Sequence, residues 1–320
     1  ATLKGIRIGG DLILAPGVTK DVTLVDCVIQ GNIRNYGTGE VRFEAPQITP
    51  ESTATKPSDV YKPGTTLDRT LEYGGKSVPI YRDRPLNVFS DVDFIWTDEE
   101  NENRRRLEYL GGEFRTRYGI DVSSFQGEID WDAVADDNID FAMVRVGFRG
   151  TGTGSLNTDK YYEQNIRGAM RAGLETGVYF FAQAVTVEEA IEEADYVISL
   201  LDGLDINGPV AYDWEMHDST YRVYGTSPEM ATACAVAFCE RIKDAGYTPM
   251  VYGGTYVTYM KYDQGALADY LSWYPEYKSE KSEKLCPTLV YHMDYWQFSS
   301  SRAVAGINGR VDMNIQFIRR

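Results

Sequence analysis

Over most of the chain, segments typical of β-strands alternate with segments typical of α-helices. From Tyr118 onward, short apolar runs are separated by longer runs with helical spacing of their apolar residues. Strands that alternate with helices over about 200 residues predict a parallel sheet, and we expect a closed, irregular β/α barrel over residues 117–320. Little helical pattern separates the last strands, so the irregularity should lie there. The predicted strands are 118–122, 140–146, 176–182, 209–215, 248–252, 270–274, 288–298 and 310–315, and the predicted helices are 131–137, 161–172, 187–201 and 227–245.

The first 116 residues contain short strand-like runs with little helical pattern. The spacing of runs and glycines in residues 1–45 predicts a β-rich region built of stacked β-turns or a small β-solenoid. Residues 46–66 carry four prolines among threonines and serines, which is typical of a linker. Residues 67–116 are predicted to form a small β-rich region. Its charged run 98–106 is expected to be a solvated hairpin tip with acids facing arginines.

One predicted strand, 209–215, ends in two carboxylates one residue apart. Because side chains alternate across a strand, Asp213 and Glu215 should project to one side while Tyr212 and Trp214 project to the other. Carboxylates at the carboxyl end of a barrel strand usually belong to an active site. The alternative is an ordinary strand end whose acids face solvent.

Two further acids are expected at the same rim of the barrel. Asp121 ends the first barrel strand and Asp312 lies near the last, with Asn314 on the same face. Four carboxyls around one pocket suit glycoside hydrolysis, which needs a proton donor and an anionic or nucleophilic partner for an oxocarbenium-like centre. Crowding also raises the pKa of a carboxyl enough for it to keep a proton near neutral pH.

Aromatic residues are dense at the same predicted strand ends. Flat rings can stack on the apolar faces of sugars and lose little conformational entropy, so their position favours a carbohydrate groove. Packing inside the barrel is the alternative explanation for about half of them. They are Tyr179, Phe181, Tyr252, Tyr256, Trp273, Tyr277, Tyr295 and Trp296.

Charge and composition exclude several classes of protein. A formal net charge of −16 argues against a nucleic-acid partner and against docking on anionic membranes. No apolar run approaches about 18 residues, so no membrane insertion is expected. The four cysteines are too scattered for a disulfide framework, and Cys234 and Cys239 are expected in the core of a helix. Neither of the two histidines lies in a ligand pattern, so no metal is expected.

Three motifs occur in a fixed order in the predicted barrel, and together they resemble the lysozymes of glycoside hydrolase family 25 over roughly residues 117–320. The resemblance implies an N-acetylmuramidase that cuts the β-1,4 bond between N-acetylmuramic acid and N-acetylglucosamine in peptidoglycan, without metal or cofactor. The motifs are Gly119-Ile120-Asp121-Val122-Ser123-Ser124-Phe125-Gln126-Gly127, Asp213-Trp214-Glu215, and Tyr295-Trp296-Gln297-Phe298-Ser299-Ser300 followed by Gly306-Ile307-Asn308-Gly309-Arg310-Val311-Asp312-Met313-Asn314.

The resemblance makes Glu215 the general acid and Asp213 its partner, with Asp121 and Asp312 completing the acidic pocket. It does not decide between a covalent glycosyl-enzyme and assistance by the substrate's 2-acetamido group. Two acids on one strand face favour assistance, in which Asp213 orients the acetamide. The residues then expected to bind the glycan are Tyr179, Phe181, Tyr252, Trp273, Tyr277 and Gln297.

Two segments depart from the family pattern. Family members often have a lysine and then a Thr-Glu-Gly-like segment where this chain has Arg145 to Gly150, and Tyr-His-Phe where it has Tyr179-Phe180-Phe181. The four acids are intact. The departures leave open the details of sugar contact and the substrate decorations that are tolerated.

A non-catalytic glycan-binding protein on the same barrel is the alternative function. The four acids argue against it, because a binder has no use for a protonated carboxyl beside a carboxylate.

For residues 1–116 the alternatives are wall binding and mere packing against the barrel. A peptidoglycan substrate implies a secreted or wall-associated protein. Ala1 opens directly into strand-like sequence without a signal peptide, which could have been removed, and a phage endolysin stays open.

Overall fold

The computed structural model describes residues 1–4, 7–8, 12–25, 28–29, 33–36, 38–44, 55–97 and 99–320. The chain divides into two compact units, Ala1–Thr53 and Ala54–Arg320. Cys27, Asp98 and residues 46–54 of the expected linker lie outside the described residues. Within the described ranges, no helix has the length and apolar character needed to cross a membrane.

The N-terminal unit consists of short parallel strands. Each residue of its first three strands pairs with the residue 21 positions later, which is the pairing of successive coils in a β-solenoid. Leu14, Val22 and Leu24 form its buried centre. The expectation of a β-rich N-terminal region is therefore confirmed. The strands are β1 (Thr2–Lys4), β2 (Arg7–Ile8), β3 (Leu12–Leu14), β4 (Val22–Val25), β5 (Val28–Ile29), β6 (Ile33–Asn35) and β7 (Val41–Glu44).

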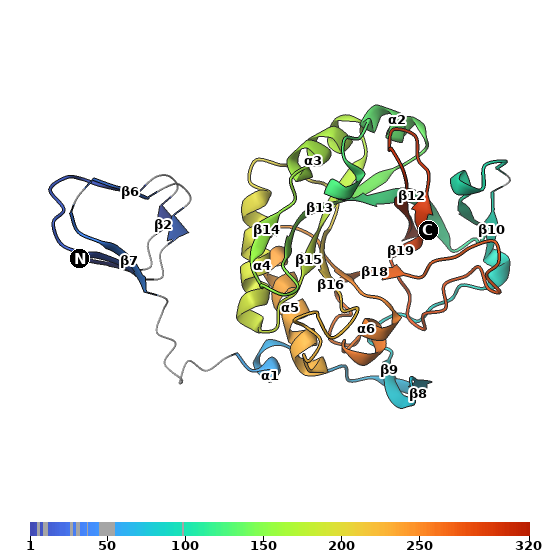
Figure 1. Ribbon diagram of the computed structural model, residues 1–320. Coiled ribbons are helices and arrows are strands. Elements are labelled where there is room, and N and C mark those ends of the chain that lie inside the picture. Colours follow the sequence, from blue (N-terminus) through green and yellow to red (C-terminus); the bar gives the residue numbers. More distant parts are fainter. Residues whose placement is uncertain are drawn as a thin grey trace. The chain divides into compact units, whose positions relative to one another are not determined.

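The second unit is organised around a closed barrel, and Figure 1 looks through the ring of strands. Eight strands follow one another in the order β12, β20, β19, β18, β17, β16, β15 and β13, and pairing of β12 with β13 closes the ring. The predicted barrel is confirmed. Its strands are β12 (Phe114–Val122), β13 (Phe141–Arg149), β15 (Glu175–Ala182), β16 (Val210–Trp214), β17 (Pro249–Tyr252), β18 (Leu271–Pro275), β19 (Tyr295–Arg302) and β20 (Val311–Arg319).

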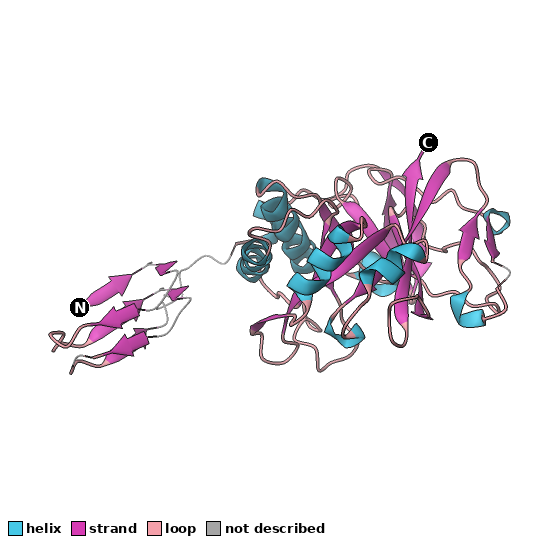
Figure 2. Cartoon of the chain, turned by 90° about the horizontal axis from the view of Figure 1, so that it is seen from above, coloured by secondary structure: helices cyan, strands magenta, loops and turns pink. Residues whose placement is uncertain are grey.

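Helices lie on the outside of the barrel, as the cyan ribbons of Figure 2 show. The helix predicted to start after Ser227 does so: the Ser227 hydroxyl accepts from the backbone N–H of Met230 at 3.2 Å, and Pro228 is its first residue. Its cysteines, Cys234 and Cys239, are fully buried, as expected. The helices are α2 (Trp131–Asp136), α3 (Tyr162–Arg171), α4 (Val187–Leu200), α5 (Pro228–Asp244) and α6 (Thr255–Met260), with a 3₁₀ turn at Ser124–Gln126.

Residues 86–110 occupy the side of the barrel where helices are scarce. Phe94 and Leu107 belong to the same buried cluster as Phe114 and Phe317, which lie on strands at that side. This segment therefore covers apolar surface that a helix covers elsewhere in the ring. Its elements are β10 (Phe94–Trp96) and β11 (Leu107–Tyr109), paired as an antiparallel hairpin, with 3₁₀ turns at Asp91–Asp93 and Glu102–Arg104.

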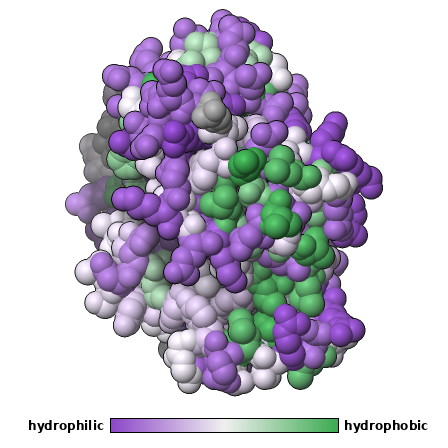
Figure 3. Space-filling view, turned by 90° about the vertical axis from the view of Figure 1, so that its right-hand side faces the viewer, coloured by the Kyte–Doolittle hydropathy of each residue, from purple (hydrophilic) through white to green (hydrophobic). Residues whose placement is uncertain are grey.

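The described residues of the charged run lie between the strands of this hairpin, as expected, but two of its arginines pair outside the run. Arg104 and Arg106 both form ion pairs with Asp137 of the barrel, while Arg105 lies 3.8 Å from Glu102 of the same run. The arginines thus mainly attach the hairpin to the barrel. The same segment exposes Val92 and Leu110, and Figure 3, which views this side, shows apolar side chains gathered among hydrophilic ones.

Residues 55–81 contact the barrel unit through a short helix and a hairpin. The backbone N–H and the hydroxyl of Thr55 both donate to Glu188 of α4, and Gly64 donates to Asp263. The described part of the expected linker is thus attached to the barrel. The elements are α1 (Pro57–Val60), β8 (Leu67–Tyr73) and β9 (Lys76–Tyr81).

Three details of the barrel differ from the sequence prediction. The strand β20 runs antiparallel to both of its neighbours, so the sheet is not wholly parallel. Residues 288–294 precede the last parallel strand instead of belonging to it, and Tyr291 forms only an isolated bridge with Leu86. The short strand β14 (Leu156–Thr158) and the helix α6 were not predicted. Strand direction is set by long-range pairing, which local sequence patterns do not encode.

Candidate active site

The strand β16 carries two acids to the rim of the barrel. Asp213 is buried on the inner face, and Glu215 follows the last strand residue with its side chain 26% exposed. Tyr212 and Trp214 point the other way into the outer hydrophobic core, as alternation predicts. The indole N–H of Trp214 donates to the carbonyl of Ala184 at 3.0 Å, which fixes the end of the strand.

The antiparallel direction of β20 places the other two acids together. Asp121, near the end of β12, faces Asp312, at the beginning of β20, in the register of these two strands. Both Gln297 and Asn314 donate from their side-chain amides to the same oxygen of Asp121, each at 2.8 Å. Asp121 is therefore held by neutral donors and no cation contacts it directly in the described structure.

Hydrogen bonds extend from these amides to the aromatic residues of the site. The Gln297 carbonyl oxygen accepts from the hydroxyls of Tyr252 at 3.2 Å and Tyr277 at 3.1 Å. The Asn314 carbonyl oxygen accepts from the indole N–H of Trp273 at 2.8 Å. Acids and rings at this rim thus form one connected, oriented set.

These groups line a single cavity of about 710 Å³ at the carboxyl ends of the parallel strands. The volume lies in the range of ordinary ligand sites. All ten residues expected to act in catalysis or glycan binding line it, which are Asp121, Tyr179, Phe181, Asp213, Glu215, Tyr252, Trp273, Tyr277, Gln297 and Asp312.

Burial and mutual proximity raise the pKa values of three of the acids. Burial raises the pKa of Asp213 well above its usual value, and the nearby charges of Glu215 and Asp121 add to the effect. The pKa of Asp312 is raised to about 8, first by burial and then by the charge of Asp121. Burial also raises the pKa of Asp121, although the donors Asn314 and Gln297 oppose it. These directions are those expected for buried carboxyls that lie close together.

Two of the aromatic residues lie elsewhere than the sequence suggested. Trp296 is fully buried in the outer core, and its indole N–H donates to the backbone carbonyl of Glu276. Tyr295 packs edge-on against Phe141 inside the barrel and hydrogen-bonds to Gln316. Neither lines the cavity, so both serve packing. Tyr256 does line it and is 47% exposed.

Sequence reasoning missed two nitrogen-bearing side chains of the cavity, His217 and Arg145. The His217 ring lies 3.0 Å from the Glu215 carboxylate, and only its place after the acid pair could have suggested this. Arg145 was noted solely as a departure from a family pattern. Its guanidinium donates to the fully buried carboxylate of Asp159 and contacts the Phe125 ring, which is 85% exposed at the cavity mouth. Among the described lining residues it is the one arginine or lysine.

The described part of the chain contains no group of three or more His, Cys, Asp or Glu side chains arranged to bind a metal ion. Asp121 is held by side-chain amides, and the raised pKa values of Asp121, Asp213 and Asp312 favour their protonated forms. Protonated carboxyls in one cavity are suited to proton transfer.

A β/α barrel with several carboxyls and aromatic rings in one rim cavity has the architecture of a glycoside hydrolase. A family model described as glycosyl hydrolases family 25 matches residues 120–307. The chain belongs to glycosyl hydrolase family 25. This membership agrees with the resemblance drawn from the three motifs.

Two curated relatives carry the word lysozyme in their names. The autolytic lysozyme of Clostridium acetobutylicum is 26% identical over 197 residues, which cover 61% of this chain and 54% of that protein. Lysozyme M1 of Streptomyces globisporus is 27% identical over 201 residues, covering 61% of this chain and 66% of that protein. The chain therefore spans between half and two thirds of these relatives.

Solved structures share the fold of the barrel. A bacterial lysozyme from Streptomyces coelicolor matches with a TM-score of 0.50 and 25% identity over 62% of this chain and 90% of that one. The spore cortex lytic enzyme SleM of Clostridium perfringens matches with a TM-score of 0.54 and 22% identity, over 63% of this chain and 67% of that one.

Proposed function

We propose that this chain is an N-acetylmuramidase that cleaves the β-1,4 bond between N-acetylmuramic acid and N-acetylglucosamine in peptidoglycan. Its family and its relatives named as lysozymes support this substrate. The observation that carries the mechanism is the state of Asp213. Its Oδ1 atom is buried at the same strand end as Glu215 and has no hydrogen-bond partner in the described structure.

In this proposal Glu215 is the general acid. It donates a proton to the glycosidic oxygen, which leaves with the bonding electrons as the 4-hydroxyl of N-acetylglucosamine. The acetamido oxygen of the muramic acid residue attacks its own C1 from the opposite side and forms an oxazolinium ring. Water then attacks C1 and gives its proton to the Glu215 carboxylate. C1 keeps its configuration because it is inverted twice.

Asp213 assists by accepting the acetamide N–H at Oδ1, which orients the acetamido oxygen toward C1. Burial raises the pKa of Asp213, which favours a proton on its carboxyl. Oδ1 remains an acceptor when that proton resides on Oδ2. The partial negative charge on Oδ1 also stabilises the positive charge of the oxazolinium ring. Without an acetamide, a buried oxygen with no partner costs about 1–3 kcal/mol, and substrate binding would relieve that cost.

The remaining residues have supporting roles. Asp121 and Asp312 share a proton beside the reacting carboxyls and limit the negative charge in the cavity. The glycan is bound by the amide of Gln297 and by flat rings, which exclude water and stack on sugar faces. These rings are Tyr179, Phe181, Tyr252, Trp273 and Tyr277.

Mass spectrometry of fragments released from purified peptidoglycan tests the cleaved bond. Borohydride reduction of the products labels the new reducing end. We expect reduced N-acetylmuramic acid. Reduced N-acetylglucosamine would show that the other glycosidic bond of the glycan is cleaved. No release of fragments from several wall types would favour a protein that only binds glycans.

The role of the acetamide is tested with substrate whose muramic acid residues carry a free amine. Assistance requires the acetamido oxygen, so we expect cleavage to fall by about 10²-fold or more, since a positioned reacting group is worth at least that factor. Asp213→Ala, which removes the acceptor oxygen, should fall similarly on the acetylated substrate. A covalent sugar adduct on Asp213, detected in the intact protein, would instead favour a glycosyl-enzyme.

A peptidoglycan substrate places the activity at the cell wall, reached by secretion or through phage-driven lysis. We also propose that the N-terminal unit contributes to wall binding. Sedimentation with purified peptidoglycan can compare the full chain with a chain lacking residues 1–53. Equal sedimentation would contradict a wall-binding role.

A further inference from the structure

A second polar network lies behind the strand that carries Glu215, outside the cavity. Its centre is Gln183, the first residue after β15, whose side chain is fully buried. The Gln183 amide donates to the backbone carbonyl of Glu215 at 2.8 Å. Gln183 is absent from the residues that line the cavity within the described chain, so it does not touch a bound glycan.

The contact with Gln183 falls where the strand ladder ends. Pairing between β15 and β16 stops at Ala182 and Trp214, so Glu215 is the first residue beyond it. The Glu215 carbonyl therefore lies beyond the β15–β16 ladder, whose hydrogen bonds would otherwise fix the backbone. The Gln183 side chain supplies the missing donor, and the orientation of the Glu215 side chain follows from that of its backbone.

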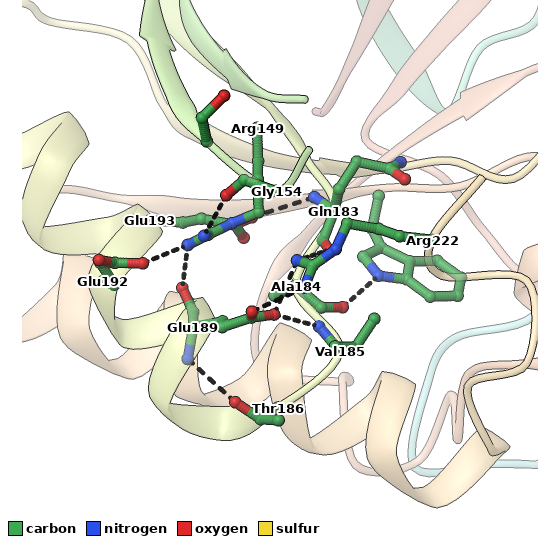
Figure 4. Close-up of polar contacts among 12 residues, drawn as sticks. Arg149, Gly154, Gln183, Ala184, Val185, Thr186, Glu189, Glu192, Glu193 and Arg222 are labelled. Carbon is green, nitrogen blue, oxygen red and sulfur yellow. Dashed lines mark hydrogen bonds and ion pairs between the residues drawn. The ribbon is translucent and has the colours of Figure 1, made fainter. Parts of the chain in front are cut away.

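Gln183 is itself fixed by a buried ion pair, shown in Figure 4. One oxygen of Glu193, a fully buried residue of α4, accepts from the Gln183 backbone N–H at 3.0 Å and from Arg149 Nε at 2.7 Å. Arg149 also donates to the Gly154 carbonyl at 2.8 Å and pairs with Glu192 at 2.7 Å. The position of Gln183 is therefore set by charged groups on two other elements.

A second arginine, Arg222, attaches the loop after Glu215 to Gln183 and to α4. Arg222 donates to the Gln183 carbonyl at 2.8 Å and to both carboxylate oxygens of Glu189. Figure 4 shows Arg222 and Arg149 reaching this segment from different sides. The Glu215 carbonyl and the loop that follows it are thus connected to α4 through Gln183 and Arg222.

We propose that Gln183 is a positioning residue for Glu215 and that the Arg149–Glu193 pair holds Gln183 in place for this task. The inference rests on the proposed role of Glu215 as the general acid. A general acid must lie within hydrogen-bond reach of the leaving oxygen, and a misplacement of about 1 Å can cost about 10²-fold in rate. A buried polar chain gives more rigid placement than an exposed loop.

The test compares Gln183→Met, Gln183→Glu and Glu192→Gln in the full chain. Methionine keeps the length of the side chain and removes the donor. We expect kcat on soluble peptidoglycan fragments to fall by about 10- to 100-fold with KM changed by less than about twofold, because misplacement affects the reacting group and not glycan binding. Glu192 is the matched control, since it pairs with the same Arg149 at the exposed side, and Glu192→Gln should keep the parent kcat.

Gln183→Glu adds a readout that a purely structural role would not change. The introduced carboxyl can donate to the Glu215 carbonyl only when protonated. Its kcat relative to the parent should therefore recover as the pH falls, while Gln183→Met stays low at every pH. At Glu193, Glu193→Gln keeps an acceptor oxygen and should retain more kcat than Glu193→Ala.

Crystal structures of the parent and of Gln183→Met separate this inference from the proposed function. A displaced Glu215 carboxyl in the variant supports positioning even if the parent releases nothing from any wall, a result that would remove only the muramidase proposal. An unmoved Glu215, or a parental kcat in folded Gln183→Met, overturns the positioning role. If Gln183→Met does not fold, the pH-dependent recovery of Gln183→Glu decides.

Discussion

Two groups of acids lie on opposite sides of the strand end that carries Glu215, and their partners differ. The cavity acids, Asp121, Asp213, Glu215 and Asp312, face one another and neutral amides. The α4 acids, Glu189, Glu192 and Glu193, pair with Arg149 and Arg222. The α4 acids are thus neutralised by arginines, whereas Asp121, Asp213 and Asp312 have no arginine or lysine partner among the described residues and have raised pKa values, as is common for acids at functional sites.

The pKa values express the same difference. Burial tends to raise the pKa of Glu189, but hydrogen bonds from Arg222 and Val185 lower it overall. In the cavity, burial and neighbouring carboxylates act in the same direction, so the pKa of Asp312 reaches about 8. Glu193 is intermediate: burial raises its pKa to about 7 although Arg149 opposes the shift. Arginine partners thus oppose burial among the α4 acids, prevailing at Glu189 but not at Glu193.

The largest effect is expected from Glu215→Gln. Removing a general acid costs about 10²–10⁴-fold in rate, and lysis of purified walls should fall by at least about 10³-fold because no other cavity acid occupies its position. The melting temperature should stay close to that of the parent. Turbidity of wall suspensions measures the loss, and circular dichroism checks the fold.

The same substitution among the α4 acids is the control for that loss. Glu192→Gln removes a carboxylate with an exposed side chain from Arg149 and should lyse walls at the parental rate. If Glu215→Gln lysed walls as fast as Glu192→Gln, Glu215 would not be the general acid, and the cavity acids would have no demonstrated role in catalysis.

The second effect concerns stability. A substitution among the α4 acids should lower the free energy of unfolding, whereas a substitution among the cavity acids should not. Glu193→Ala leaves Arg149 buried without its fully buried partner, and loss of one member of a buried pair costs about 3–5 kcal/mol. Asp312→Asn removes a carboxyl whose charged form is disfavoured, so it should not destabilise the fold at pH 8. Urea unfolding of the two variants measures both values. A destabilisation of Asp312→Asn as large as that of Glu193→Ala would show that both groups are structural.

The third effect is a dependence of stability on pH. The pKa of Asp312 in the folded chain is about 8, above its ordinary value of 3.8, so between these values the folded state binds more protons than the unfolded state. Stability is therefore full at acidic pH and falls as the pH rises toward about 8. We expect a loss of about 1–3 kcal/mol between pH 5 and pH 8, since solvent in the cavity reduces the full value of the shift.

Asp312→Asn removes this titrating group, so its stability should vary less with pH in the same range. Unfolding in urea at several pH values compares it with the parent. Parallel curves for the two proteins would contradict a raised pKa at Asp312.

The cavity acids could be predicted from the sequence, but the network around the α4 acids could not. Alternation along one strand was enough to direct Asp213 inward and Trp214 outward, because a strand has a fixed period. Asp121 and Asp312 followed from their places at strand ends, although β20 proved to be antiparallel. These are local signals.

Gln183, Arg149 and Glu193 are single residues on separate elements, and nothing in their neighbourhood in the sequence marks them. Their contacts arise only after the barrel has closed. Arg145 has the same origin, since its partner Asp159 follows a hairpin whose course is set by tertiary packing. Long-range ion pairs have no periodic signature, so structure is needed to find them.

The smallest effect is the response of activity to salt. The chain has a formal net charge of −16, and cell walls are often anionic, so long-range attraction does not bring enzyme and substrate together. The cavity acids and the buried Arg149–Glu193 pair are little screened at ordinary ionic strength, because salt acts mainly on exposed charges. Lysis rates should change by less than about twofold between ~0.05 and ~0.3 M salt. A steep fall of the lysis rate with salt would mean that exposed charges guide binding. Activity would then depend on surface charges more than on the cavity acids and the α4 acids.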